Sequence, residues 1–145
     1  MRYVVFKLTE HTLGLSLEWV REILKSPSVT AIPQSPDFIE GVIYLRKHHV
    51  AAMNLRKRLG YPSLEKSQDY YVIMVKWGNR VLGLIVDKIL SIVEIDEHEI
   101  DESRKVGPGY VDTRTLRGIC LKEGKEIFLL SLENLLREKV TSVQP

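Results

Sequence analysis

The sequence predicts a mostly β domain built from two copies of one small β-rich unit. Its apolar runs are short, rich in β-branched residues and broken by glycine and proline, a pattern typical of barrels and sandwiches. Strands and helices do not alternate along the chain, so a parallel α/β sheet is not expected. Internal similarity is the third observation. Residues 41–59 (GVIYLRKHHVAAMNLRKRL) align without a gap on residues 118–136 (GICLKEGKEIFLLSLENLL), and residues 6–15 align on residues 75–84.

A repeat of this kind should be sought before any other feature, because it determines how the whole fold is interpreted. Two copies are too few for a solenoid. We therefore expect a single bilobal domain over residues 1–145, with a seam between its lobes. The approximate repeats are residues 1–62 and 70–139, and the polar stretch 63–69 is the expected linker.

Strand propensity accounts for most of the first half. The expected strands are Arg2–Leu8, Leu13–Leu17, Val29–Ile32, Phe38–Arg46 and His49–Asn54. Apolar residues between positions 19 and 24 fall at helical spacing and predict a short helical turn that ends before Pro27. Lys47-His48 is the expected hairpin turn, and Leu55–Leu59 is a second helical turn that Gly60 stops.

The second half follows a similar order. The expected strands are Tyr70–Trp77, Val81–Ile89, Ser91–Ile95, Leu116–Leu121 and Glu126–Leu130. Turns are expected at Gly78-Asn79 and Glu123–Lys125, and an irregular stretch is expected from Asp96 to Thr115. Leu132–Lys139 is the longest helical segment, and the tail Thr141–Pro145 should fray.

Composition restricts the possible classes of protein. The chain has 145 residues, a formal charge of +2, 44% hydrophobic and 28% charged residues, which is ordinary for a globular domain. Near-balanced charge argues against a protein that neutralises many phosphates. Cys120 is the only cysteine and lies in an apolar run, so we expect a buried hydrophobe in a reducing compartment. We find neither a signal-peptide pattern nor an apolar stretch of roughly 18 residues, and we expect a cytoplasmic protein.

Three clusters suggest binding sites, but each has a plainer interpretation. His48 and His49 are adjacent on a strand and point to opposite faces, so they are not expected to chelate one metal ion. The acidic residues between 96 and 102 lack the order of a calcium loop. The basic run Arg56–Arg58 lacks the interleaved aromatic residues of a nucleic-acid groove. No nucleophile or phosphate-loop motif is present, and we expect no cofactor, no metal and no enzymatic activity.

The order of several motifs resembles the CheW-like family of chemotaxis coupling proteins, and the likeness spans nearly the whole chain. The strand FKL opens the series, and the segment LGLSLEWVREIL and the proline loop IPQSPDFIEGV follow it. The later motifs are LR at Leu45-Arg46 and at Leu55-Arg56, VLGLIVDKI with Asp87, and the closing segment LRGICLKEGKEIFLLSLENLL. Their order and spacing together carry the resemblance.

The resemblance implies two SH3-like five-stranded β-barrels packed through a shared apolar seam, with short helices and a C-terminal helix. It also implies a non-catalytic adaptor that joins the regulatory domain of a CheA-type histidine kinase to the cytoplasmic tip helices of chemoreceptors. A groove between the barrels would receive the receptor helix, and the second barrel would contact the kinase. The residues that match the family's receptor-contact positions are Val20, Glu22, Gly41, Arg46 and Val86.

The chain departs from the family pattern in one hairpin. The family usually has glycine after the first LR motif, whereas this chain has Lys47. Because lysine carries a Cβ, we expect a different turn here if that glycine served a positive φ. Ala51 replaces a usual proline and Asn54 replaces a usual aspartate. A diverged scaffold of a non-chemotactic kinase pathway therefore stays an alternative, and a small-barrel nucleic-acid-binding protein is a more distant one.

The contact residues also have plainer interpretations. Arg46 is either an interface arginine or a solvated arginine at a strand end. Glu22 either pairs with a receptor cation or is a surface carboxylate four residues after Glu18. Val20 and Val86 are apolar, and residues of this type are more often in the core than at an interface.

Overall fold

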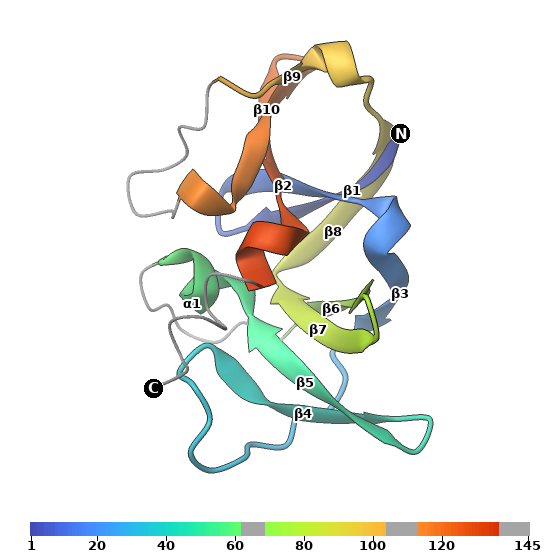
Figure 1. Ribbon diagram of the computed structural model, residues 1–145, viewed down its shortest axis with the longest axis vertical. Coiled ribbons are helices and arrows are strands. Elements are labelled where there is room, and N and C mark those ends of the chain that lie inside the picture. Colours follow the sequence, from blue (N-terminus) through green and yellow to red (C-terminus); the bar gives the residue numbers. More distant parts are fainter. Residues whose placement is uncertain (62–68, 104–112, 137–145) are drawn as a thin grey trace.

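The computed structural model describes residues 1–61, 69–103 and 113–136, and the strands in these ranges form two sheets (Figure 1). The six-stranded sheet consists, in spatial order, of β8 (Lys88–Glu94), β1 (Arg2–Leu8), β2 (His11–Ser16), β11 (Lys125–Leu130), β10 (Leu116–Lys122) and β9 (Ile100–Asp101). The five-stranded sheet consists of β3 (Val20–Lys25), β6 (Tyr71–Trp77), β7 (Arg80–Val86), β5 (His48–Asn54) and β4 (Ile39–Leu45). The mostly β fold that the sequence predicts is confirmed.

Helical structure in the described ranges is short. The segments with helical structure are η1 (Leu17–Trp19), α1 (Leu55–Leu59), η2 (Glu97–Glu99), η3 (Thr113–Thr115) and residues 132–136. Helix α1 begins at Asn54, whose side chain accepts a hydrogen bond from the amide of Lys57, and ends at Gly60, which adopts a φ of 96°. The prediction of a helical turn that Gly60 stops is therefore confirmed.

Each sheet combines strands from both halves of the chain (Figure 1). Strands β1 and β2 lie between β8 and β11, whereas β6 and β7 lie between β3 and β5. Strand β2 runs parallel to β11 with Gly14 opposite Leu129, and β7 runs parallel to β5 with Gly83 opposite Ala52. The internal alignment equates these two pairs of residues. The sheets therefore share one strand plan, although neither half of the chain forms a sheet by itself. The proposed division at residues 63–69 falls almost wholly outside the described residues.

The largest core lies between the two sheets, because alternate residues of a strand face opposite sides. On β1, Val4, Phe6 and Leu8 enter the shared core, whereas Tyr3 and Val5 enter a separate core of the six-stranded sheet. The matching strand β6 behaves in the same way, with alternate residues in the shared core and in a third cluster. Leucines of α1 and of residues 132–136 complete the seam.

The predicted helical turn between residues 19 and 24 is wrong. Residues 17–19 form a short 3-10 turn, and Val20–Lys25 is strand β3, paired with β6. A register shift between Val20 and Glu22 explains the misleading spacing. Such a bulge lets Val20 and Ile23, three residues apart, both pack against the shared core.

Other boundaries differ in smaller ways. The expected strand at 29–32 is an isolated bridge between Thr30 and Val42. The expected strand at 81–89 breaks at Asp87, because β7 and β8 belong to different sheets. The expected irregular stretch at 96–115 contains η2, β9 and η3, while residues 104–112 lie outside the described ranges. The C-terminal helix is described only over residues 132–136, and the tail at 141–145 is not described.

Candidate protein-interaction site

The structure brings two of the five predicted contact residues together. Arg46 lies in the turn between β4 and β5, and Glu22 lies on β3. The guanidinium donates two hydrogen bonds to the carboxylate, from Nη1 to Oε1 at 2.5 Å and from Nη2 to Oε2 at 3.2 Å. This two-point geometry is the one in which arginine binds a carboxylate most specifically. Because β3 and β4 are opposite edges of the five-stranded sheet, the pair joins the two edges around the barrel.

The pair remains open to solvent and to a partner. The side chain of Arg46 is 71% exposed, and that of Glu22 is 29% exposed. The hydrogen bond from Arg46 lowers the pKa of the Glu22 carboxyl, and the same bond raises the pKa of Arg46. Both groups therefore stay charged at neutral pH. Salt bridges at this level of exposure stabilise a fold only slightly.

The turn that holds Arg46 keeps a left-handed backbone without glycine. Arg46 has a φ of 48° and Lys47 a φ of 67°. Lys47 adopts a positive φ although it carries a Cβ, so the lysine does not exclude a left-handed turn here. Two consecutive residues with positive φ match the twist of the flanking strands, which favours this geometry in a two-residue hairpin. The turn also lies one residue earlier than predicted, at Arg46-Lys47, and His48 begins β5.

The other three predicted contact residues lie below the surface to different degrees. Val20 is half-buried against the shared core, at the start of β3. Val86 is fully buried in that core, so it can affect a partner only through packing. Gly41 is buried where Thr30 crosses β4, and a Cβ built on it would lie 2.0 Å from the Thr30 carbonyl oxygen. Glycine is needed there for close backbone approach.

Sequence reasoning missed the role of the basic run in α1. The side chain of Arg58 is buried, and its Nε donates to the carbonyl oxygen of Leu135 at 2.8 Å. Arg56 Nη2 lies 2.6 Å from Asp87 Oδ1, and Lys57 Nζ lies 3.0 Å from Glu40 Oε1. All three cations therefore engage groups of the chain itself. The physical basis for a nucleic-acid site at this run is weak, because Arg56 and Lys57 are paired with carboxylates and Arg58 is buried against backbone carbonyls.

Asp87 links the two sheets at the seam. Its Oδ1 pairs with Arg56 of helix α1, which directly follows β5 of the five-stranded sheet. Its Oδ2 accepts a hydrogen bond from the amide of Thr9 at 2.5 Å. Thr9 lies in the turn between β1 and β2 of the six-stranded sheet. The signal available in the sequence was the aspartate directly after the buried strand VLGLIV, although nothing there identified its partners.

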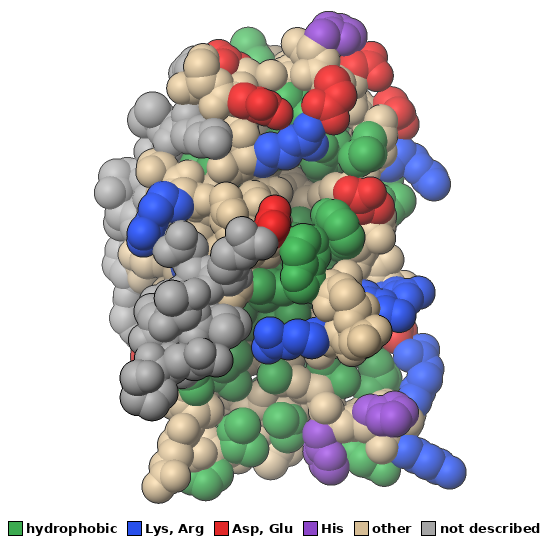
Figure 2. Space-filling view, in the orientation of Figure 1, with side chains coloured by type: hydrophobic (Ala, Val, Ile, Leu, Met, Phe, Trp, Pro, Cys, Tyr) green, Lys and Arg blue, Asp and Glu red, His purple; other side chains and the backbone are tan. Residues whose placement is uncertain are grey.

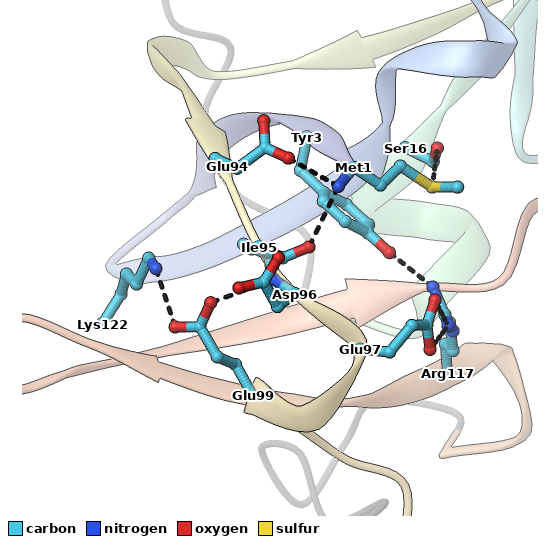
Figure 3. Close-up of polar contacts among 10 residues, drawn as sticks. All are labelled: Met1, Tyr3, Ser16, Glu94, Ile95, Asp96, Glu97, Glu99, Arg117 and Lys122. Atoms are coloured by element: carbon cyan, nitrogen blue, oxygen red, sulfur yellow. Dashed lines mark hydrogen bonds and ion pairs between the residues drawn. The ribbon is translucent and has the colours of Figure 1, made fainter.

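The acidic stretch around η2 is largely compensated by two cations (Figure 3). Arg117 donates from Nη2 to both carboxylate oxygens of Glu97, at 2.7 and 2.6 Å, and from Nη1 to the hydroxyl of Tyr3. Lys122 Nζ lies 2.7 Å from Glu99 Oε2. Residues 1–61, 69–103 and 113–136 contain no group of three or more His, Cys, Asp or Glu side chains that could hold a metal ion. The same ranges contain no helix long and apolar enough to cross a membrane.

These features define a class of protein. Two sheets share an apolar seam, a charged pair joins an exposed hairpin to β3, and the cations around η2 and α1 engage groups of the chain itself. This is the architecture of a small β-barrel scaffold that acts by binding proteins.

The chain belongs to the family of CheW-like domains, whose sequence profile matches residues 2–140. Proteins of this family are non-catalytic scaffolds. Chemotaxis protein CheW of Thermotoga maritima is 26% identical over 92% of this chain and 85% of its own length. Chemotaxis protein CheW of Klebsiella aerogenes is 27% identical over 92% of this chain and 80% of its own length. The crystal structure of the scaffolding protein TtCheW from Thermoanaerobacter tengcongensis superimposes with a TM-score of 0.83. It is 36% identical, and the match covers 92% of this chain and 86% of that protein. The predicted SH3-like barrel pair and family membership are confirmed.

Proposed function

We propose that this protein is a chemotaxis adaptor that joins the regulatory domain of a CheA-type histidine kinase to the cytoplasmic tip helices of chemoreceptors. The observation that carries the proposal is the structural match to the scaffolding protein TtCheW over 92% of the chain. The proposal places the protein in the cytoplasm, where both partners expose these domains. The chemistry is recognition, and the bridge places the kinase under receptor control.

The receptor side of the proposal rests on the surface around Arg46. Val20 supplies a half-buried apolar residue, and Glu22 and Arg46 supply paired charges close to it. An amphipathic helix has an apolar stripe flanked by polar groups, and such a helix binds in an apolar groove with a charged rim. Gly41 and Val86 take part indirectly, by fixing β4 and the shared core. The kinase side is assigned to the second barrel, the one formed by the six-stranded sheet that contains β8 to β11, without individual residues.

Each interface is expected to be modest by itself. Interfaces in transient signalling complexes are often below about 1,200 Å² and bind weakly. Two such contacts on one scaffold become stronger when both partners are present, because the second contact forms at high effective concentration.

The test is a calorimetric titration of the full chain with the isolated regulatory domain of the kinase and, separately, with a soluble receptor tip hairpin. Arg46→Ala should weaken receptor binding about tenfold, the effect of losing an interface arginine worth roughly 1–2 kcal/mol. Kinase-domain binding should not change. Arg80→Ala is the matched control, because Arg80 is also an exposed arginine at a hairpin turn.

Three outcomes decide the proposal. Saturable binding of both partners, with the loss confined to the receptor side, supports it. Loss of kinase binding in a folded Arg46→Ala variant would keep the adaptor but move Arg46 to the kinase interface. No binding of either partner at tens of micromolar would overturn the adaptor proposal and leave a diverged scaffold of another kinase pathway.

A further inference from the structure

We infer that Trp19 and Trp77 select the receptor helix of the proposed adaptor, through apolar contact with their rings and hydrogen bonds from their indole N–H groups. They are the only two tryptophans of the chain. The inference rests on the proposed function, because it names residues that recognise one of the two proposed partners. Neither tryptophan is among the five positions that match the family's receptor contacts.

The apolar seam between the sheets is filled by helices on one side and is open on the other. Figure 1 draws α1 and residues 132–136 on one side of β8, and η1 and β3 on the other. Leucines of both helices belong to the buried shared core. On the η1 side, Trp19, Val20 and Trp77 pack against the same core but are only half-buried. We call these three residues, together with Ile89 and Ile92 of β8, the open rim.

Strand β8 supplies the second wall of the open rim. Ile89 lies opposite Phe6, and Ile92 lies opposite Val4. Phe6 and Val4 both belong to the shared core, so a bulge in β8 brings two residues three apart to the same face. Ile92 is nevertheless 53% exposed. Figure 2 shows hydrophobic side chains gathered at the waist of the molecule, where Figure 1 draws β8 beside β6 and β7.

The strand plan does not require a tryptophan at the open rim. Continuing the alignment of residues 6–15 on 75–84 without a gap equates Val20 with Ile89, so β3 and β8 are matching walls. The same alignment equates Trp19 with Lys88, which is exposed. One of the two matching strands therefore folds with a charged residue at this position. Recognition of a partner gives a reason for the indole that the strand plan does not give.

The two indoles present an apolar surface together with unused donors. Their ring centroids lie 5.0 Å apart, with an interplanar angle of 57°. Among the described residues, neither Nε1–H of Trp19 nor that of Trp77 has an acceptor, and neither nitrogen is buried. An indole N–H can only donate, and it usually has a hydrogen-bond partner once it is covered. A protein that covers the open rim is therefore expected to bring oxygen acceptors to it.

The occupant that fits these groups is one amphipathic helix. On the closed side, the same seam is filled by helices whose leucines lie between the sheets, and a helix on the open side completes it in the same way. Its aliphatic stripe lies on the indole rings, and Gln, Asn or Glu side chains beside the stripe accept from the two N–H groups. The open rim is continuous with the proposed receptor surface, because Val20 belongs to both. The receptor helix is therefore the occupant that we assign.

The test is a titration of the full chain with a soluble receptor tip hairpin that lacks tryptophan, followed by tryptophan emission. The emission should shift to shorter wavelength, because both indoles of the chain become covered. Ile92→Ser should weaken receptor binding about tenfold by removing apolar surface from the second wall. Leu121→Ser is the matched control, because Leu121 is 65% exposed on β10, outside the open rim, and its loss should not change receptor binding.

The hydrogen bonds are tested by variants that keep an aromatic ring. Trp19→Phe and Trp77→Phe each remove one donor, so each should weaken receptor binding about three- to tenfold. Binding of the kinase regulatory domain should not change, which shows that the variants are folded. In a second hairpin, alanine replaces the Gln, Asn and Glu side chains beside the stripe. Wild type should bind this hairpin more weakly than the first, whereas the double variant Trp19→Phe/Trp77→Phe should bind both hairpins equally.

The outcomes separate this inference from the proposed function. Calorimetric binding of the first hairpin without a change in emission, or with full affinity in both single Trp→Phe variants, would overturn the inference and leave the adaptor standing. Loss of kinase-domain binding together with receptor binding in these variants would assign the indoles to the fold and would also overturn it. If wild type binds the kinase domain but not the hairpin, the receptor side of the proposed function and the inference are both refuted.

Discussion

The hairpins β4–β5 and β10–β11 occupy matching places in the two sheets, and their backbones agree closely. Each first strand has a register shift before its glycine, at Gly41 and at Gly118. The turn residues have φ values of 48° and 67° in the first hairpin, and of 51° and 77° in the second. Thr30 pairs with Val42 where β9 pairs with the matching residue of β10. Strand β9, the additional strand of the six-stranded sheet, is therefore the counterpart of the isolated bridge between Thr30 and Val42.

The side chains at the two turns differ in kind. The second turn is Glu123-Gly124, in which glycine accepts the left-handed conformation without steric cost. The first turn is Arg46-Lys47, in which two residues with a Cβ adopt that conformation. Residues that break a local rule are expected mainly at functional sites. The comparison indicates that the fold requires only the backbone of this turn, which leaves the side chains of the first hairpin available for the proposed binding.

The largest expected difference between the hairpins concerns their two glycines. A Cβ at position 41 would meet the Thr30 carbonyl oxygen at 2.0 Å, whereas one at position 118 would meet the Asp101 carbonyl oxygen at 2.8 Å. We expect Gly41→Ala to lower the free energy of unfolding by about 3 kcal/mol or more, and Gly118→Ala by about 1–2 kcal/mol. Urea unfolding of both variants measures the difference.

Gly78→Ala separates the steric contact from the backbone conformation in that experiment. Gly78 has a φ of 61°, and a Cβ there would have no neighbour within 4 Å. Gly78→Ala should lower the free energy of unfolding by about 1 kcal/mol, because only the positive φ opposes the new side chain. If Gly41→Ala and Gly118→Ala lower the free energy of unfolding equally, the closer approach of Thr30 to Gly41 does not affect stability.

The seam gives the next largest effect. Asp87 pairs with Arg56. The alignment equates Arg56 with Glu133, and continuing the alignment of 6–15 on 75–84 without a gap places Asp87 opposite Glu18, so both matching residues are acidic. No equivalent ion pair can form between those two residues. In Asp87→Asn, the Thr9 amide keeps an oxygen acceptor, while the guanidinium of Arg56 loses its carboxylate. Its side chain is only 19% exposed, and in the described structure its buried Nε has no hydrogen-bond partner.

We therefore expect Asp87→Asn to lower the free energy of unfolding by about 2 kcal/mol. Chemical denaturation at neutral pH is the measurement. Asp37→Asn is the control, because the Asp37 side chain is 91% exposed and lies 3.9 Å from Lys57. An equal, small change in the two variants would mean that the Arg56 pair does not hold the sheets together.

The turns themselves should respond in opposite directions. Lys47→Gly removes a Cβ from a residue with a φ of 67°, and Gly124→Lys adds one where φ is 77°. We expect the first variant to gain about 1 kcal/mol of stability and the second to lose a similar amount. Thermal unfolding measures both. A change of the same sign in the two variants would show that the turns are not equivalent.

The internal repeat and the alternation of apolar residues were enough to predict the β class and most strands. They were not enough where a contact joins residues distant in sequence. Glu22 and Arg46 meet because the barrel closes, and no local pattern encodes that closure. The bulge in β3 placed its apolar residues at helical spacing. Strand β3 pairs with β6 of the second half, and β8 pairs with β1 of the first half. This exchange leaves no local signal, because each strand has an ordinary strand composition. The acceptor of Arg58 is a backbone carbonyl 77 residues away, so no local pattern indicated that this cation is buried.

The smallest expected effect is on the pKa of two carboxyl groups, Glu22 in its pair with Arg46 and Glu99 in its pair with Lys122. The hydrogen bond from Arg46 is the main cause that lowers the pKa of Glu22. For Glu99 the main cause is the backbone amide of Asp96, and the Lys122 side chain comes second. We therefore expect Arg46→Ala to return the pKa of Glu22 close to its usual value. Lys122→Ala should return the pKa of Glu99 only part of the way, which NMR titration of the carboxyl carbons can measure.

The same pKa shifts fix how each pair contributes to stability. A carboxyl whose pKa is lowered on folding stabilises the fold above its unfolded pKa, and this contribution is lost as the pH falls through the folded value. Wild type should therefore lose the contribution of the Glu22 pair below about pH 4.5, the region of an unfolded glutamate's pKa. Arg46→Ala should lack most of that part of the acid dependence, whereas Arg80→Ala should retain it. If Arg46→Ala leaves the pKa of Glu22 low, the pair does not persist in solution. In that case Arg46 would be free for a partner, and the edge strand β4 of the five-stranded sheet would depend on its bridge to Thr30.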